Sequence, residues 1–220
     1  MLKIYGSDLS SPANKVRFAA NVLGLKYDYI KIDLRSGEQQ KPEFLKIHPA
    51  GKIPAIDDDG FILFESNAII RYLADKNKSP LYPKDLRERA LIEQWLDFGS
   101  LHVGAALAKV MYNRVFAPMR GVPVDESSLK EGLVFLERFL PVVEEQLGKN
   151  KFLAGNQRTL ADINLLALID PAEAASVDLA KYKNITKWRN ALKKEEFYTK
   201  CHKEYGESLK KREQPQLQKR

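Results

Sequence analysis

The sequence has few residues that could support metal or dithiol chemistry. It contains one cysteine, Cys201, in 220 residues, and its three histidines show no metal-ligand spacing. A single cysteine excludes an intrachain disulfide, a CxxC redox pair and a cysteine-based zinc site. We therefore expect no metal and no cofactor that depends on a pair of thiols.

Long apolar runs are also missing. No window approaches the roughly 20 consecutive apolar residues that a membrane-spanning helix needs. The first ten residues, MLKIYGSDLS, lack the basic start and apolar run of a secretory signal. These absences predict a cytoplasmic protein with no membrane partner.

The net charge of +7 is the main compositional bias of the chain. Such a charge can attract nucleic acid, but the lysines are scattered along the sequence. The densest basic clusters, residues 210–212 and 219–220, lie in the tail beside glutamates and glutamines. We interpret this tail as a solvated helix with a frayed end, expect no nucleic-acid partner, and note that the excess charge suits a small anionic ligand.

The first third of the chain alternates strand and helix patterns. A short strand at 2–5 precedes a helix that starts at Ser11-Pro12, and a second strand follows at 27–34. A polar loop with a short helix leads to two apolar strands separated by Asp59-Gly60, a hairpin signal. A helix from Ser66 completes the order β-α-β-α-β-β-α, which predicts a small mixed sheet covered by helices.

The rest of the chain predicts helices only. Residues 77–84 contain two prolines and little periodicity, so we interpret them as a linker. Helical spacing follows at 86–116 and 126–147, with a proline- and glycine-containing loop (Pro118, Gly121) between them. Thr159 and Asp162 form a capping-box pattern before an apolar helix, and shorter helices are expected near 171–180 and 184–194. The predicted architecture is an α/β domain at 1–76 and an all-α domain at 85–220 that ends in the basic tail.

Four segments together resemble the cytosolic glutathione S-transferases. They are Ser10-Ser11-Pro12 after the first strand, GKIPA at 51–55, FESNAII at 64–70 and TLADI at 159–163. The first segment is most similar to the serine-type classes (theta-, phi- and delta-like). The resemblance implies a thioredoxin-like first domain, glutathione as co-substrate, and a homodimer.

The resemblance implies that Ser10 is the catalytic hydroxyl that stabilises the glutathione thiolate. A helix N-terminus next to this hydroxyl adds a favourable field for an anion. We interpret Ser11 as the N-cap of the first helix, which makes it the alternative. Tyr5 is a second alternative because some classes use an early tyrosine, although it falls within the first strand.

The resemblance also assigns glutathione contacts. The backbone N–H and C=O of Ile53 would pair with the cysteinyl backbone. The family has a cis peptide bond there, although the sequence alone favours trans. Ser66 would take the γ-glutamyl carboxylate and Glu65 its ammonium group. Gln39 stands where a histidine commonly holds the glycyl carboxylate, and Asn14 where an arginine often stands. The full predicted set is Gln39, Gln40, Lys52, Ile53, Pro54, Glu65 and Ser66, with Lys41 or Lys52 as the positive charge.

We expect the electrophile pocket between the domains, lined by Leu9, Tyr112, Phe116 and Met119, with Phe197, Tyr198 and Tyr205 closing it. The implied function is conjugation of the glutathione thiolate to hydrophobic electrophiles in detoxification, with glutathione peroxidase activity as an addition. Two alternatives remain open: a non-catalytic binding protein with the same fold, and a glutathione-dependent disulfide reductase.

Overall fold

The computed structural model describes residues 1–207, and they divide into two compact units. Unit 1 comprises Met1–Asn77 together with the segment that begins at Glu195, and unit 2 comprises Lys78–Lys194. This division differs from the predicted helical domain at 85–220, because the chain from Glu195 onward packs with the first unit. The predicted basic tail lies outside the described residues.

Unit 1 contains a four-stranded mixed sheet. The strands are β1 (Leu2–Gly6), β2 (Tyr27–Lys31), β3 (Ala55–Asp58) and β4 (Phe61–Phe64), in the order β2-β1-β3-β4. β1 runs parallel to β2 and antiparallel to β3. Asp59 and Gly60 both have positive φ angles, 53° and 93°, as a tight two-residue hairpin requires, so the predicted hairpin is confirmed.

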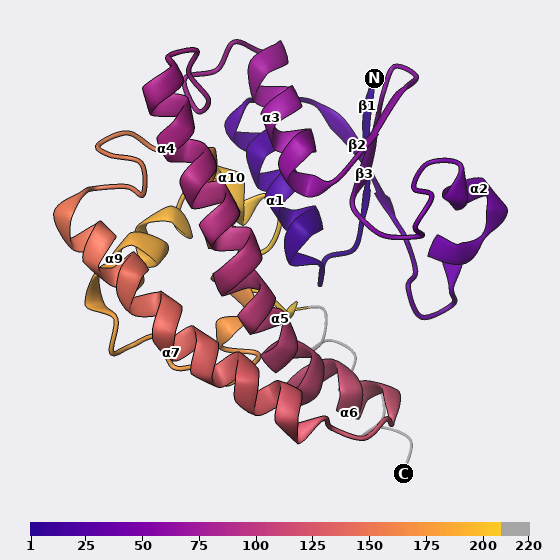
Figure 1. Ribbon diagram of the computed structural model, residues 1–220. Helices are drawn as coiled ribbons and strands as arrows, with labels where there is room; N and C mark the ends of the chain where they lie inside the picture. The colour runs from indigo at the N-terminus through magenta and orange to yellow at the C-terminus, as the bar shows by residue number, and fades with distance from the viewer. Residues whose placement is uncertain (208–220) are drawn as a thin grey trace. The chain divides into compact units, whose positions relative to one another are not determined.

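Two helices cover one face of this sheet. Helices α1 (Ser11–Val22) and α3 (Ser66–Lys76) lie together on one side of the strands, and the short α2 (Pro42–Leu45) lies on the other (Figure 1). Fully buried side chains from β1, α1, β3 and α3 form the core between sheet and helices, among them Ile4, Phe18, Ile56 and Ile69. The predicted order β-α-β-α-β-β-α is confirmed.

The segment after Glu195 packs on α1. Its short helix α10 (Glu196–Thr199) places Phe197 and Tyr198 against Phe18, with ring centroids 5.8 and 5.2 Å apart. The Asn21 side-chain amide also donates to the Phe197 carbonyl at 2.8 Å. Phe197 and Tyr198 are therefore core residues of unit 1, because burying two aromatic rings against α1 removes a large apolar area from water.

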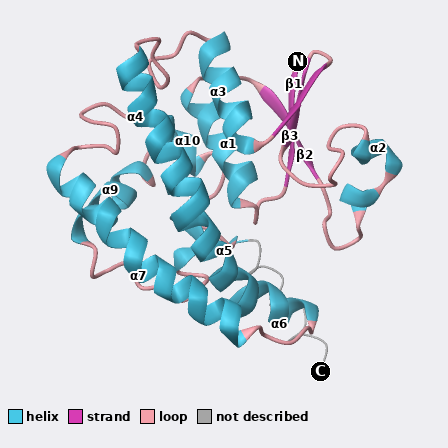
Figure 2. Cartoon of the chain, in the orientation of Figure 1, coloured by secondary structure: helices cyan, strands magenta, loops and turns pink. Residues whose placement is uncertain are grey.

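Unit 2 begins with one long helical path that has local changes in pitch. It consists of α4 (Leu86–Asp97), a π-helical segment (Phe98–Gly104), α5 (Ala105–Met111), a second π-helical segment (Tyr112–Phe116) and α6 (Ala117–Arg120). Figure 2 shows α4, α5 and α6 following one another. The predicted helix at 86–116 thus continues through Pro118, which was expected in a loop, because proline is tolerated in the first turn of α6.

Three further helices complete unit 2. They are α7 (Glu126–Lys149), the apolar α8 (Leu160–Ile169) and α9 (Lys183–Leu192). The predicted helix at 171–180 is wrong: a 3-10 turn at Asp170–Ala172 is followed by turns. Ser176 adopts a positive φ of 53°, and the Val177 amide donates back to the Ala172 carbonyl, a closure that ends helices. No helix within residues 1–207 is long and apolar enough to cross a membrane.

Close packing of α7 on α5 gives a stability prediction. A Cβ added at Gly132 would lie 2.8 Å from the Ala106 carbonyl oxygen and 3.0 Å from two side-chain carbons of α5. We expect Gly132→Ala to lower the free energy of unfolding by about 1–3 kcal/mol, because overpacking outweighs the better helix propensity of alanine. Chemical denaturation measures the change.

Gly148→Ala is the matched control in the same helix. A Cβ there would meet only the end of the Asn184 side chain, at 3.0 Å. Gly148→Ala gains the same helix propensity as Gly132→Ala at less steric cost, so we expect the free energy of unfolding to stay the same or to rise slightly. Equal effects of the two substitutions would contradict the packing argument.

Candidate active site

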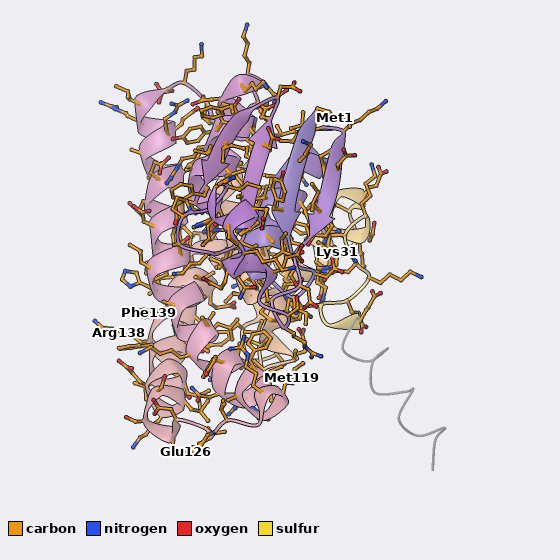
Figure 3. All side chains as sticks on the ribbon, turned by 90° about the vertical axis from the view of Figure 1, so that its right-hand side faces the viewer. Met1, Lys31, Met119, Glu126, Arg138 and Phe139 are labelled. Atoms are coloured by element: carbon orange, nitrogen blue, oxygen red, sulfur yellow. The ribbon has the colours of Figure 1, made fainter. Side chains whose placement is uncertain are left out.

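The candidate site begins in the loop that follows β1. Figure 3 labels Met1 and Lys31 at opposite ends of the sheet, and the loop leaves β1 at the Lys31 end because β1 and β2 are parallel. The Lys31 ammonium donates to the Asp8 carboxylate at 2.7 Å. Two amides close the loop: the Ser10 N–H donates to the Ser7 carbonyl, and the Asn14 side chain donates to the Asp8 carbonyl, both at 2.9 Å.

Ser10, and not Ser11, is the N-cap of α1. Its backbone is extended (φ −97°, ψ 106°), and its Oγ accepts a hydrogen bond from the Ala13 N–H at 3.3 Å. Ser11 is the first helical residue, so its predicted capping role is wrong. The reason is local, since Pro12 at the second helical position has no N–H and the Ala13 amide is the one that a side chain at position 10 reaches.

The loop that carries Ser10 is tied down from two directions. Arg17 is buried on α1, and its guanidinium donates to the side chains of Asp8 and Asn14, both at 3.2 Å. From the C-terminal segment, the Tyr205 hydroxyl donates to the Leu9 carbonyl at 2.7 Å. Asn14, which departs from the arginine common in the family, therefore still holds this loop. None of these contacts was expected from the sequence.

Tyr5 lies on β1 with its ring against Phe44 of α2, at a centroid distance of 6.1 Å in an edge-to-face arrangement. Such a contact favours a packing role for this tyrosine. Ser10 is therefore a better candidate than Tyr5 for the catalytic hydroxyl.

A second part of the site is the turn before β3. The Ile53–Pro54 peptide bond is cis. The trans bond expected from the sequence alone is therefore wrong, and the cis bond implied by the resemblance is present. The cis and trans forms of a peptide bond before proline are close in energy, so the surrounding fold decides between them. Pro54 is buried, Ile53 is half-buried and Lys52 is exposed.

The loop at 37–41 lies against this turn. A Cβ added at Gly51 would fall 2.6 Å from the side-chain nitrogen of Gln40 and 2.8 Å from the carbonyl oxygen of Gln39, so the two glutamines lie beside the turn that precedes Ile53. The Gln39 side-chain oxygen is buried without a hydrogen-bond partner in the described chain. A carboxamide can turn its N–H₂ group to the same place, so Gln39 has the chemistry to meet a carboxylate.

The third part of the site is the start of α3. Glu65 precedes the helix with a positive φ of 69°, an uncommon conformation for a residue other than glycine. Its side chain makes no capping hydrogen bond to the first turn. The first amides of α3 therefore lack a partner from their N-cap side chain, and such amides at a helix N-terminus favour an anion.

Lys15 is the site residue that the sequence analysis missed. It is only 2% exposed, and its ammonium donates to the Ser66 hydroxyl at 3.1 Å and to the Asn67 side-chain oxygen at 2.7 Å. Burial is the main cause that lowers the pKa of Lys15; Arg71 also lowers it and Glu65 raises it, and together they bring it to about 7. A signal was present in the sequence, since position 15 is followed at i+4 by Ala19 of the apolar stripe and so falls on the buried side of α1.

The residues expected around the electrophile belong to different units. Leu9 lies in unit 1, whereas Tyr112, Phe116 and Met119 lie in unit 2, on the second π-helical segment and α6. Tyr112 and Met119 are each 42% exposed. The pocket that these residues would share stays a prediction. Residues 1–207 contain no group of three or more metal-ligating side chains that could hold an ion.

Comparison with known proteins gives the family. The glutathione S-transferase N-terminal domain matches residues 1–75, and the glutathione S-transferase C-terminal domain matches residues 105–196. Glutathione S-transferase F10 of Arabidopsis thaliana is 43% identical over 143 residues, which are 64% of this chain and 66% of that protein. The alignment with this plant relative thus covers just under two thirds of its length.

The matches to solved structures cover a larger share of both chains. A delta-class glutathione transferase of Nilaparvata lugens superposes with a TM-score of 0.83 at 33% identity, covering 96% of this chain and 97% of that one. Maize glutathione S-transferase I, in complex with an atrazine glutathione conjugate, gives a TM-score of 0.82 at 30% identity, covering 91% and 95%. The Arabidopsis relative is of the phi class, so two of the expected serine-type classes are represented. The thioredoxin-like first domain and the helical second domain are confirmed, and the chain belongs to the glutathione S-transferase family.

Proposed function

We propose that this transferase conjugates the glutathione thiolate to hydrophobic electrophiles and that Ser10 donates the hydrogen bond that stabilises the thiolate. The supporting observation is the capping geometry of Ser10. A hydroxyl has one proton and two lone pairs, and the Ala13 N–H uses a lone pair. Capping therefore leaves the proton of Ser10 for a ligand, at a helix N-terminus that favours negative charge.

The magnitudes are sufficient for this role. A free thiol has a pKa of about 8.5, and lowering it by two units needs about 2.7 kcal/mol of extra stabilisation for the anion. A hydrogen bond to a charged group contributes about 1.5–3 kcal/mol, and the helix dipole adds about 0.3–1 kcal/mol. One hydroxyl at the start of α1 can therefore supply most of the activation.

The remaining glutathione contacts would come from the turn before β3, the adjacent loop at 37–41 and the start of α3. The backbone of Ile53 would pair with the cysteinyl residue as a sheet edge pairs with a peptide. Ser66 and the first amides of α3 would hold the γ-glutamyl carboxylate, and Glu65 its ammonium group. Gln39 and Gln40 would face the glycyl carboxylate, with Lys41 or Lys52 supplying positive charge near it.

Steady-state turnover tests the proposed reaction. With glutathione present, we expect the purified protein to conjugate a chlorinated nitroaromatic. Reduction of an organic hydroperoxide would add peroxidase activity. Reduction of a mixed disulfide at a higher rate than both of these reactions would favour the reductase alternative. Retention on immobilised glutathione without turnover of any of the three would favour a binding protein.

Three broader predictions rest on the family resemblance. They are a homodimer, a cytoplasmic location and a role in detoxification. Gel filtration with light scattering measures the oligomeric state directly, and a monomer at micromolar concentration would contradict the homodimer.

A further inference from the structure

We propose that Lys15 is a positioning residue for the γ-glutamyl end of glutathione: it orients the Ser66 hydroxyl and supplies the buried positive charge that makes the site select for a carboxylate there. The inference rests on the proposed function, because it assumes that the γ-glutamyl carboxylate binds at the start of α3. Lys15 acts through Ser66 and is not placed in contact with the reacting sulfur.

The first step of the argument is the direction of the hydrogen bond at Ser66. An ammonium group has only protons to give, so the contact at 3.1 Å makes the Ser66 Oγ the acceptor. The hydroxyl proton must then point to another acceptor. A carboxylate at the N-terminus of α3 would be such an acceptor.

The second step concerns burial. Lys15 is 2% exposed, and the two groups to which it donates, the Ser66 hydroxyl and the Asn67 side-chain oxygen, are neutral. Taking an ammonium group out of water is costly unless a negative charge compensates. A bound carboxylate at the first turn of α3 would compensate this cost and favour the charged form of Lys15.

The charged groups that face Lys15 come from α3 and its N-cap. Arg71 lowers the pKa of Lys15 and Glu65 raises it, while burial is the largest influence and brings the pKa to about 7. Lys15 is therefore only partly charged at neutral pH in the absence of ligand. Carboxylate binding raises its pKa, so protons are taken up on binding, and affinity should fall as the pH rises above about 7.

A pair of ligands separates this role from a structural one. S-methylglutathione cannot form a thiolate, and its analogue with 4-aminobutyrate in place of the γ-glutamyl residue lacks only the carboxylate. We expect wild type to bind S-methylglutathione more tightly than the analogue. Lys15→Met should weaken S-methylglutathione about tenfold more than it weakens the analogue, and Lys15→Arg should restore part of the difference because it keeps the charge.

The pH dependence in wild type provides a second readout that needs no variant to fold. Between pH 6 and 8.5 we expect the Kd of S-methylglutathione to rise by up to about tenfold per pH unit above 7, relative to that of the analogue. The ammonium groups of the two ligands differ in pKa, because only one of them is next to a carboxylate, so the part of the pH dependence that Lys15→Arg removes is the part assigned to Lys15. Lys15→Arg should flatten the difference.

The outcomes separate the two hypotheses. Equal weakening of both ligands by Lys15→Met, together with a pH-independent difference in wild type, would overturn the role of Lys15 and leave the proposed function intact. Wild type that binds both ligands equally would place the carboxylate elsewhere and also overturn the role. If wild type binds neither S-methylglutathione nor glutathione, the proposed function itself fails.

Discussion

Replacing Ser10 with alanine is expected to lower kcat/KM for conjugation about 10- to 100-fold and to raise the pKa of the bound glutathione thiol toward its free value of about 8.5. The loss corresponds to the hydrogen bond that the Ser10 hydroxyl would donate to the thiolate. Measurement of kcat/KM against pH, together with the ultraviolet absorbance of the bound thiolate, gives both quantities.

Ser10 also caps α1, so its loss has a structural component. Alanine removes the acceptor for the Ala13 N–H, which costs about 1 kcal/mol of stability. Ser10→Gly isolates the chemistry, because glycine is nearly as good an N-cap as serine and has no side-chain donor; we expect it to fold like wild type and to remain impaired.

Ser11→Ala is the matched control for the Ser10 variants. Ser11 is the first residue of α1 and makes no capping hydrogen bond, so activity should stay within about twofold of wild type. The assignment would be wrong if Ser10→Gly kept full activity while Ser11→Ala lost it. Full activity in both would exclude a serine mechanism in this loop.

The fold was largely predictable because it depends on local patterns. Alternating and helical periodicities gave the order of strands and helices in unit 1, and Asp59-Gly60 gave the hairpin. The segment from Glu195 was less readable: its attachment to α1 depends on aromatic packing between residues about 180 positions apart, such as Phe18 and Tyr198. Periodicity within a helix contains no information about such a partner.

The site was predictable in its residue types and less so in its geometry. The choice between Ser10 and Ser11 as N-cap turned on which residue has extended backbone angles, a difference of one position. The cis form of the bond before Pro54 could be expected only from the resemblance. Lys15 was missed because a lysine in a helix is usually exposed, and only the approach of α1 to the first turn of α3 reveals its two hydrogen bonds.

Replacing Asp162 with alanine is expected to lower the free energy of unfolding by about 3–5 kcal/mol, since several buried donors would lose their acceptor. Asp162 is fully buried and belongs to the capping box that the sequence predicted and the structure confirms. Its carboxylate accepts from the amides of Leu153 and Thr159, at 3.1 and 2.9 Å, and from the indole of Trp188 on α9 at 3.1 Å. Although burial raises its pKa to about 6, the group remains mainly ionised at neutral pH and accepts all three bonds.

Asp125→Ala is the matched control for the Asp162→Ala prediction. Asp125 is the exposed N-cap of α7 and accepts from the Ser128 amide at 2.9 Å. Its loss should cost only about 1 kcal/mol, because water can replace the missing acceptor at the surface. Denaturant unfolding at pH 7 measures both variants. The two substitutions remove the same chemical group from a helix start. A difference of about 2 kcal/mol or more between their losses of unfolding free energy therefore isolates the cost of leaving buried donors unpaired. Equal losses would show that water reaches the Asp162 position.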